Sequence, residues 1–225
     1  MQPLLLAEEP SWRWLSKPAG LPVFPPHKDP DGPSLHRWLL THYPDQDQPF
    51  PRGFSGGLAH RLDTATSGVV LAARSPQDLD RARAAFAAGA LHKTYRFLTH
   101  KSVTWSTHHV TTPVAHHPRR RDRMVPRRSA GTAHRGRWYP ADTRLRQLDG
   151  ALWEAVITTG VMHQIRVHAA TVGLALTGDR LYGGGTRPPE GAPPEATFAL
   201  HHVGLVGGGL RSPVLAQPAW WGPYS

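Results

Sequence analysis

The apolar segments of this chain are short, and prolines and glycines separate them. None of them is long enough to span a bilayer, and residues 1–9 lack the basic start and the small-residue cleavage site of a signal peptide. At 225 residues the chain can bury one sizeable core. We therefore expect a cytoplasmic protein with a single domain, with or without lobes, over residues 1–225.

Hydrophobic spacing predicts three helices. Ser34 is the expected N-cap of a short amphipathic helix, and Ser75, which is followed by proline, is the expected N-cap of a second helix that ends at Gly89. A third helix is expected over residues 163–173, with Arg166 in its first turns. Alternating or continuous apolar runs predict strands over residues 67–74, 92–100, 152–160 and 198–206.

The chain is strongly basic, with a formal net charge of +10. Arginine carries most of this charge, and its planar guanidinium suits contacts with phosphates and nucleobases. A genome rich in G and C would also enrich arginine codons, so composition alone favours nucleic-acid binding only in part. The arginines concentrate in residues 116–137, a segment with prolines and no hydrophobic periodicity. We expect it to be a mobile basic loop that holds phosphates; the alternative is a solvated run with no dedicated ligand.

The chain has no cysteine, which excludes disulfides, thiolate metal ligands and thiol nucleophiles. Its 15 histidines include adjacent pairs, but neighbours on a strand point to opposite faces, so each pair supplies at most one ligand to a site. No carboxylate converges with them in sequence. We expect no metal site.

Three segments carry candidate site residues, namely Asp63 in a turn, Tyr95 on a strand and Arg166 at a helix start. Alone, Asp63 reads as a turn-forming residue. The residues around the three extend the pattern, which consists of KPAGLPV (17–23), HRLDTATSG (60–68), KTY (93–95), HQIRVH (163–168), GDRLYG (178–183) and LHHVGL (200–205). Together these motifs resemble the RluA family of RNA pseudouridine synthases, over about residues 14–213. We expect no S4-type RNA-binding module before them.

The resemblance implies an α+β fold, built on a mixed, mainly antiparallel curved sheet with flanking helices and a basic active-site cleft. It implies an enzyme that isomerises specific uridines of ribosomal or transfer RNA to pseudouridine. By the same resemblance, Asp63 is the catalytic nucleophile, Tyr95 packs against the target uracil, and Arg166 pairs with Asp63. Arg61 would enter the gap that the flipped base leaves.

These residue types suit that chemistry. The reaction breaks the C1′–N1 bond of uridine and rejoins the ring through C5 with no atoms gained or lost, so no cofactor is expected. The nucleophile must be ionised, burial opposes this, and a guanidinium beside it favours the charged form. Leu62 and Ile165 are expected to wall the pocket. The expected RNA contacts are His60, His163, Arg119, Arg120, Arg121, Arg123, Arg127 and Arg128. We expect an RNA stem-loop as partner, no membrane, and a monomer.

One motif departs from the family pattern. Where the family usually has TGRTHQIR, this chain has TGVMHQIR, so Val161 and Met162 replace an arginine and a threonine. The loss of this cation puts one RNA or scaffold contact in doubt. Two alternatives stay open. One is a catalytically weak or silent RNA-binding protein on the same scaffold, and the other is a hydrolase that releases a base. The hydrolase would need a second acid, and the motifs offer only Asp179, which we expect to be structural.

Overall fold

The computed structural model describes residues 2–187 and 191–224, and the chain divides into two compact units. The first unit comprises Met1–His92 and His201–Gln217, and the second comprises Lys93–Leu200 and Pro218–Ser225. The single-domain organisation stays a prediction.

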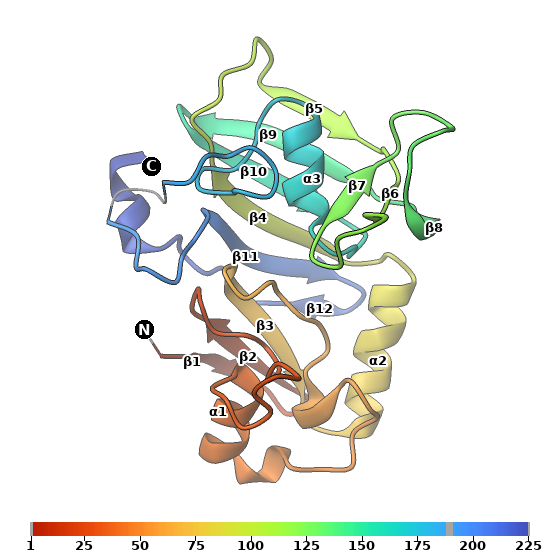
Figure 1. The fold of residues 1–225 in the computed structure, drawn as a ribbon. Helices are drawn as coiled ribbons and strands as arrows, with labels where there is room; N and C mark the ends of the chain where they lie inside the picture. The colour runs from red at the N-terminus through yellow and green to blue at the C-terminus, as the bar shows by residue number, and fades with distance from the viewer. Residues whose placement is uncertain (1, 188–190, 225) are drawn as a thin grey trace. The chain divides into compact units, whose positions relative to one another are not determined.

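The first unit is built on a sheet in which β3 is central. The strand order is β1-β2-β3-β11, with β12 paired to β11. The β3–β11 pair is parallel, whereas β1–β2, β2–β3 and β11–β12 are antiparallel. The strands are β1 (Leu4–Glu8), β2 (Trp12–Lys17), β3 (Ser67–Ala73), β11 (Leu200–Gly207) and β12 (Leu210–Arg211) (Figure 1).

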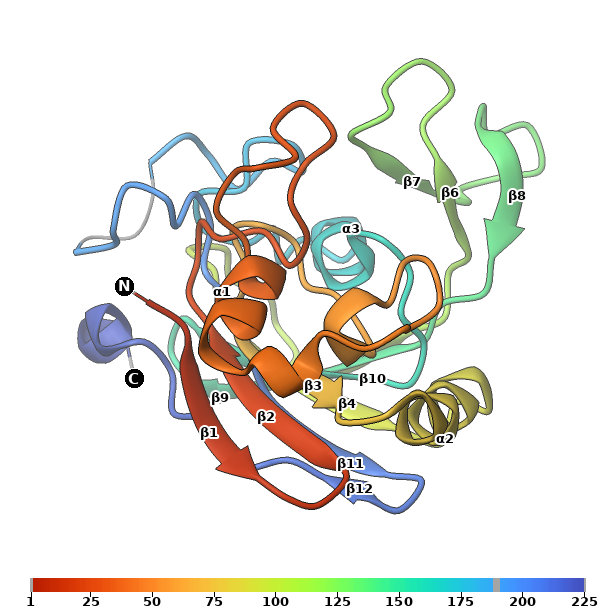
Figure 2. The same ribbon diagram turned by 90° about the horizontal axis from the view of Figure 1, so that it is seen from below.

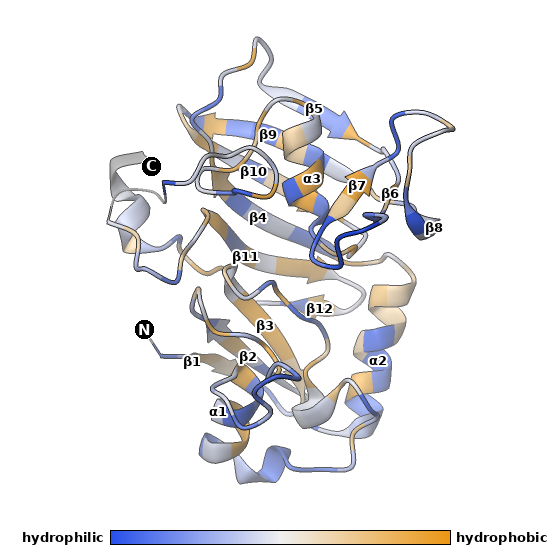
Figure 3. Ribbon diagram, in the orientation of Figure 1, coloured by the Kyte–Doolittle hydropathy of each residue, from blue (hydrophilic) through white to orange (hydrophobic). Residues whose placement is uncertain are grey.

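The β3 strand is buried along its whole length, as the apolar run predicts. Its orange colour in Figure 3 marks the hydrophobic residues. On one face Val69 and Leu71 join a core with Trp14 of β2 and with Leu79 and Ala82 of α2 (Pro76–Ala87). This core fixes the strand whose start follows Asp63.

The helix ends of the first unit follow the predicted capping residues. The Ser34 side chain accepts from the Arg37 amide at 3.1 Å at the start of α1 (Leu35–His42). The Ser75 side chain accepts from the Asp78 amide at 3.1 Å at the start of α2. Both N-caps are therefore confirmed. Two short 3-10 helices, η1 (Pro44–Gln46) and η2 (Ser55–Gly57), interrupt the segment between them.

The second unit contains two antiparallel sheets. The larger has the order β4-β10-β9-β5, and the smaller has the order β7-β6-β8. Figure 2 shows β7, β6 and β8 side by side. The strands of this unit are β4 (His92–Leu98), β5 (Thr107–Val110), β6 (Val114–His116), β7 (Met124–Pro126), β8 (Arg135–Tyr139), β9 (Thr143–Asp149) and β10 (Leu152–Ile157). A 3-10 helix, η3 (Ala219–Tyr224), closes the described chain.

Helix α3 (Gln164–Thr171) is buried almost all round. It packs against β9 of the larger sheet and β7 of the smaller sheet. The predicted helix over residues 163–173 is confirmed. The hydrophobic spacing from which we predicted it implies one buried face, and this implication is wrong, because every residue from Gln164 to Ala169 is buried. Two sheets enclose the helix, so its polar residues need partners inside the unit.

The basic segment over residues 116–137 is not the irregular loop that we expected. It contains β7 and the start of β8, and both pair with β6. Val114 and Met124 are buried in a small core with Val167 of α3, which is what holds the short strands in place. The turns between these strands carry most of the arginines, and Figure 3 shows the β6–β7 turn in blue.

The predicted fold class is confirmed, since the units combine helices with a mixed, mainly antiparallel set of strands. In the part of the chain that the structure describes, no helix is long and apolar enough to cross a membrane.

Candidate active site

Asp63 lies in the loop that leads into β3, and hydrogen bonds hold the backbone of this loop. The Thr66 amide donates to the Asp63 carbonyl at 3.0 Å, which closes a turn. The Thr64 carbonyl accepts from the Gly20 amide at 2.8 Å and from Lys17 Nζ at 3.1 Å. The Asp63 side chain is half-buried. Residues before α1 therefore fix the backbone that carries the candidate nucleophile.

Lys17 holds three carbonyl oxygens around its ammonium group. Its side chain is fully buried, and Nζ also donates to Pro18 O at 2.9 Å and Leu21 O at 2.7 Å. Burial lowers the pKa of Lys17 to about 7, and the charge of Asp63 acts in the opposite direction. This lysine lies in the KPAGLPV motif, and no role was predicted for it from the sequence. Its place at the end of an apolar strand was the available signal.

The structure explains why position 68, the last residue of the HRLDTATSG motif, is a glycine. Its φ is +129°, and a Cβ at this position would lie 2.3 Å from the His202 carbonyl oxygen and 2.5 Å from the His202 amide nitrogen. Only glycine therefore permits the close parallel approach of β3 and β11 directly after the Asp63 turn. The Ser67 hydroxyl lies 2.8 Å from His201 Nδ1, which adds a side-chain bond across the same strand pair.

The residues that flank Asp63 differ in exposure. Leu62 is buried, as expected for a wall residue, and Arg61 is exposed. His60 is half-buried, and its Nε2 accepts from the Leu71 amide at 3.2 Å. The His60 ring also contacts the rings of Phe86 and His202 at 5.3 and 5.6 Å. These contacts support the strand, and the RNA-binding role of His60 stays a prediction.

Tyr95 occupies the middle of β4 in the second unit. Its side chain is 8% exposed, and its backbone pairs with Ala155 of β10. Lys93 lies on the same face two residues earlier, where Nζ donates to Thr159 O at 2.7 Å and burial lowers its pKa to about 8. Lys93 therefore ties the strand of Tyr95 to the turn before α3.

Arg166 is buried on α3 and binds Asp179 with two parallel hydrogen bonds. Nε donates to Oδ2 at 2.6 Å and Nη2 donates to Oδ1 at 2.9 Å. Asp179 is 1% exposed, and its Oδ1 also accepts from the Leu181 amide at 3.1 Å. The guanidinium stacks over Phe198 at 4.3 Å and Tyr182 at 5.1 Å. Planar bidentate pairing of this kind fixes the direction of the guanidinium as well as its charge.

Asp179, which we expected only to be structural, is thus the buried carboxylate partner of Arg166. The signal was present, because Asp179 is the second acid in the motif set. Its partner was not evident, since Arg166 was assigned to Asp63 alone.

His163 stands at the N-cap of α3 in the left-handed conformation, with φ of 57°, and it is the one non-glycine residue with positive φ in the described chain. Its Nδ1 lies 2.9 Å from the Tyr182 hydroxyl, which also accepts from the Met124 amide at 2.9 Å. Burial raises the pKa of Tyr182 to about 12. Left-handed backbone at a non-glycine residue is strained and occurs often at functional sites. Tyr182 joins this N-cap to β7.

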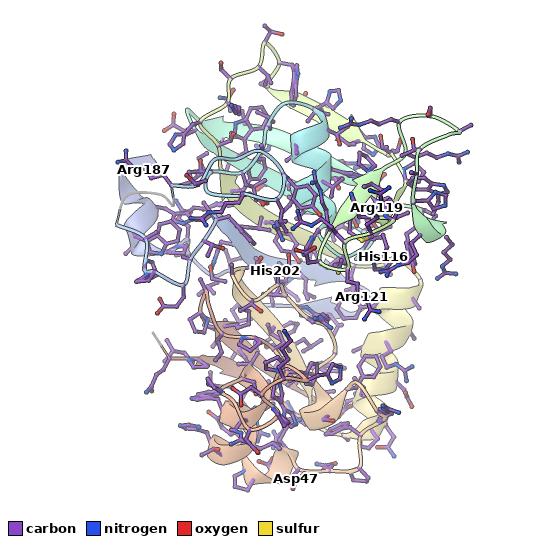
Figure 4. All side chains as sticks on the ribbon, viewed as in Figure 1. Asp47, His116, Arg119, Arg121, Arg187 and His202 are labelled. Atoms are coloured by element: carbon purple, nitrogen blue, oxygen red, sulfur yellow. The ribbon has the colours of Figure 1, made fainter. Side chains whose placement is uncertain are left out.

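The arginines of the small sheet point largely to solvent. Arg119, Arg120, Arg121, Arg127 and Arg128 are exposed, and Arg123 is half-buried. His117 Nδ1 accepts from the Arg119 and Arg120 amides at 3.2 and 3.1 Å, which orders the turn between β6 and β7. Arg120 pairs with Asp122 at 2.9 Å. Figure 4 labels Arg119 and Arg121 in this turn, close to His116 of β6.

The predicted site residues are divided between the two units. The first unit holds His60, Arg61, Leu62 and Asp63, and the second holds Tyr95, His163, Ile165 and Arg166 together with the basic segment. Ile165 is buried, as expected. Asp63 belongs to the first unit, whereas Arg166 and Tyr95 belong to the second. The pairing of Asp63 with Arg166 and the packing of the target uracil against Tyr95 therefore stay predictions. Among the described residues, no group of three or more His, Asp or Glu side chains could hold a metal ion.

The chain matches known proteins over most of its length. A family model described as RNA pseudouridylate synthase matches residues 13–171. The chain is 34% identical over 182 residues to ribosomal large subunit pseudouridine synthase D of Yersinia pestis, covering 79% of this chain and 52% of that one. It is 30% identical over 225 residues to an uncharacterized RNA pseudouridine synthase of Synechocystis, covering 96% of this chain and 65% of that one. The chain spans about half the length of the first relative.

Solved structures share the fold. Human RNA pseudouridylate synthase domain containing 4 superposes with a TM-score of 0.71 at 22% identity, covering 96% of this chain and 89% of that one. Human RNA pseudouridylate synthase domain containing 1 gives a TM-score of 0.68 at 20% identity, covering 91% and 78%. The matched family residues include Asp63, Tyr95 and Arg166, whereas Asp179 and Tyr182 follow them in the chain.

Proposed function

Since this chain belongs to the RNA pseudouridylate synthase family, we propose that it isomerises uridine to pseudouridine in RNA, with Asp63 as the nucleophile. The observation that carries the proposal is the family match over residues 13–171, which includes all three candidate catalytic residues. It is supported by the hydrogen bonds that hold the Asp63 loop and by the bidentate pair that orients Arg166.

The reaction needs three things of the protein. A nucleophile attacks ribose C1′ or uracil C6, a closed pocket retains the detached base while it turns, and a base removes the proton from C5. Asp63 supplies the first. Its backbone is held at its own carbonyl by the Thr66 amide and at the next residue by the Lys17 bond to Thr64 O. Because the loop is already ordered, the nucleophile can be held in one orientation, and no conformational entropy of the loop has to be lost at each turnover.

Arg166 is proposed to keep the Asp63 carboxylate ionised and aimed. A guanidinium has five N–H donors in a rigid plane, so it can bind Asp179 and a second carboxylate together. The bonds to Asp179 use Nε and Nη2. In this account Asp179 is a positioning residue, which acts by holding Arg166 in the direction of the reacting groups.

Tyr95 and Arg61 are proposed to handle the flipped base. A uridine in folded RNA must leave its stack before it can react. The buried Tyr95 ring offers a flat face to uracil, and such base–aromatic stacking is worth roughly 1–3 kcal/mol per base. Arg61 is exposed two residues before Asp63, which suits a side chain that fills the vacated position in the RNA.

The exposed arginines of residues 116–137 are proposed to bind phosphates of a stem-loop. Ribosomal RNA is the favoured substrate, because the Yersinia relative is named for the ribosomal large subunit, and transfer RNA is the second candidate. We expect the protein to act as a monomer, since the candidate nucleophile, its arginine and the stacking ring all come from one chain. We also expect it to act in the cytoplasm.

The direct test is product analysis. The purified chain is incubated with transcripts of large-subunit ribosomal RNA and of transfer RNAs, and the nucleosides are then separated. The proposal expects pseudouridine with the native chain and none with Asp63→Asn, while Asp47→Asn, an exposed carboxylate of the same unit (Figure 4), keeps the activity. Released uracil would point to a hydrolase, and RNA binding without product would point to a silent RNA-binding protein.

A further inference from the structure

A pocket of about 370 Å³ opens in the second unit beside the N-terminus of α3. Three segments line it, namely β6–β7, the end of β8 and the turn before α3. The lining residues are His116, Met124, Tyr139, Pro140, Thr159, Gly160, Val161 and Met162. We call it the Val161 pocket. Its volume falls within the range of about 300–1,000 Å³ that small-ligand pockets occupy.

The two residues that depart from the family motif form one wall of this pocket. Val161 is half-buried, and Met162 is one of the few large hydrophobic side chains that are exposed among the described residues, at 36%. An arginine at position 161 would occupy part of this space, and a threonine at position 162 would replace an apolar side chain with a smaller polar one. The departure therefore does more than remove a cation, because it leaves two apolar side chains in the wall of the pocket.

The polar groups of the turn before α3 already have hydrogen-bond partners within the protein. The Thr159 hydroxyl donates to Gln164 Oε1 at 2.8 Å, and the Val161 amide donates to the same oxygen at 3.1 Å. The Thr159 hydroxyl also accepts from the Asp142 amide at 3.0 Å. Because these groups already have partners, apolar and aromatic atoms dominate what a bound molecule would touch. The rings of His116 and Tyr139 meet edge to face at 6.0 Å and supply the aromatic part.

The surroundings of the pocket are strongly cationic. Residues 116–140, which supply four of the lining residues, contain eight arginines and a single acid, Asp122. The Arg137 guanidinium lies 4.9 Å from the centre of the Tyr139 ring, at the pocket itself. An apolar, aromatic hollow with arginines around it matches a planar base that carries phosphates on either side.

We propose that the Val161 pocket binds one unpaired nucleobase of the RNA substrate other than the target uridine, while the neighbouring arginines bind the adjoining phosphates. The inference rests on the proposed function, because it assumes an RNA substrate. It makes Val161 and Met162 specificity residues of this chain.

Methionine methyl groups provide a direct readout. The chain has three methionines, Met1, Met124 and Met162, and the last two line the pocket. The full chain, isotopically labelled at the methionine methyl carbons, is titrated with each of the four nucleoside monophosphates and with inorganic phosphate. We expect the Met124 and Met162 signals to move with at least one nucleotide and not with phosphate, and the Met1 signal to stay in place. Unmoved pocket signals with all four nucleotides would overturn the proposal.

The variant Val161→Arg distinguishes two explanations of Val161, because they predict opposite changes in RNA affinity. If Val161 marks only a lost phosphate contact, restoring arginine strengthens RNA binding. If the pocket takes a base, the arginine fills it, the nucleotide-induced shift of Met124 disappears, and affinity for the RNA falls about ten-fold, the loss expected when one stacked base is released. Equal or tighter RNA binding by Val161→Arg would overturn the proposal.

Two further variants control this test. Thr104→Arg adds the same charge at an exposed position of the second unit and should not weaken binding. Met162→Thr changes the wall at the more exposed position, so it keeps the test available if Val161→Arg folds poorly. Pseudouridine formation is measured on the same samples. Shifts without product would contradict the proposed function alone, and product without shifts would contradict the pocket alone.

Discussion

The buried guanidinium of Arg166 and the buried carboxylate of Asp179 face each other in a bidentate pair, with N–O distances of 2.6 and 2.9 Å. The pair links α3 to the GDRLYG turn, and its aromatic surroundings exclude water from it. This geometry indicates a structural role, which can be separated experimentally from the proposed catalytic role of Arg166.

Removing one partner of this pair should destabilise the fold. In Asp179→Ala the Arg166 charge loses the carboxylate that compensates it in a buried position, and such changes cost about 3–5 kcal/mol. Chemical denaturation gives the free energy of unfolding. Asp122→Ala, which removes the acid of the exposed pair with Arg120, is the matched control and should leave the unfolding midpoint in place. Equal midpoints for the two variants would show that the buried pair does not support the fold.

Replacing both partners should separate stability from catalysis. The double variant Arg166→Met with Asp179→Leu removes both buried charges and fills their space with apolar groups, a change that is often neutral for stability. We expect it to unfold at a higher denaturant concentration than Arg166→Met alone, yet to form no pseudouridine. Recovery of product in the double variant would remove Arg166 from the catalytic account.

Lys17 should make the stability depend on pH. Its pKa is about 7 in the folded chain and 10.5 in the reference state. Between these values the unfolded chain binds a proton that the folded chain has released, so the free energy of unfolding rises with pH, by up to about 1.4 kcal/mol per unit. Below pH 7 both states are protonated, and the contribution is constant.

The comparison with Lys17→Met isolates this contribution from the other titrating groups. The difference in unfolding free energy between the two proteins should change in favour of the native chain from about pH 7 to about pH 10.5. A constant difference across that window would mean that the three carbonyl bonds keep Lys17 charged at every pH measured.

Gly68→Ala should disrupt the strand pair behind the Asp63 loop. The added Cβ would lie 2.3 Å from the His202 carbonyl oxygen, and the backbone has a positive φ that alanine rarely adopts. We expect a loss of stability of a few kcal/mol, roughly that of other strained or overpacked sites, measured by thermal unfolding. Gly131→Ala is the control, because nothing lies within 4 Å of its Cβ position. Similar unfolding temperatures for the two variants would contradict the close-approach argument.

The basic turn between β6 and β7 should set part of the salt dependence of RNA binding. Replacing Arg119, Arg120 and Arg121 with glutamine should reduce the slope of log affinity against log salt by roughly 2, if each arginine neutralises one phosphate. The matched control replaces Arg37, Arg81 and Arg83, exposed arginines of the first unit that each pair with an acid. If the two triple variants have the same slope, the turn is a solvated run without a ligand.

Local signals in the sequence predicted the elements that carry the site. Ser34 and Ser75 cap helices as expected, and β3 is the buried strand that its apolar run indicates. The family inferred from the motifs is confirmed by the match over residues 13–171. These features depend on neighbours along the chain, which is why a single sequence reveals them.

The elements that were missed depend on contacts between distant segments. Strands β6 and β7 have three residues each, and their buried residues, such as Met124, are too few to show a period. The β9 strand does alternate, with Leu145 buried between exposed Arg144 and Arg146, and this signal was available. The pairing of Arg166 with Asp179 depends on how the turn after Thr177 folds back on α3, and no local pattern specifies it.

The most direct test of the central claim is a pseudouridine map of total RNA at single-nucleotide resolution, from the native host lacking the gene and complemented with either the native chain or Asp63→Asn. The account predicts at least one uridine, in ribosomal or transfer RNA, that is modified with the native chain and unmodified with Asp63→Asn at equal protein levels. Identical maps from the two strains would contradict it, because Asp63 could then not be the nucleophile of an RNA pseudouridine synthase.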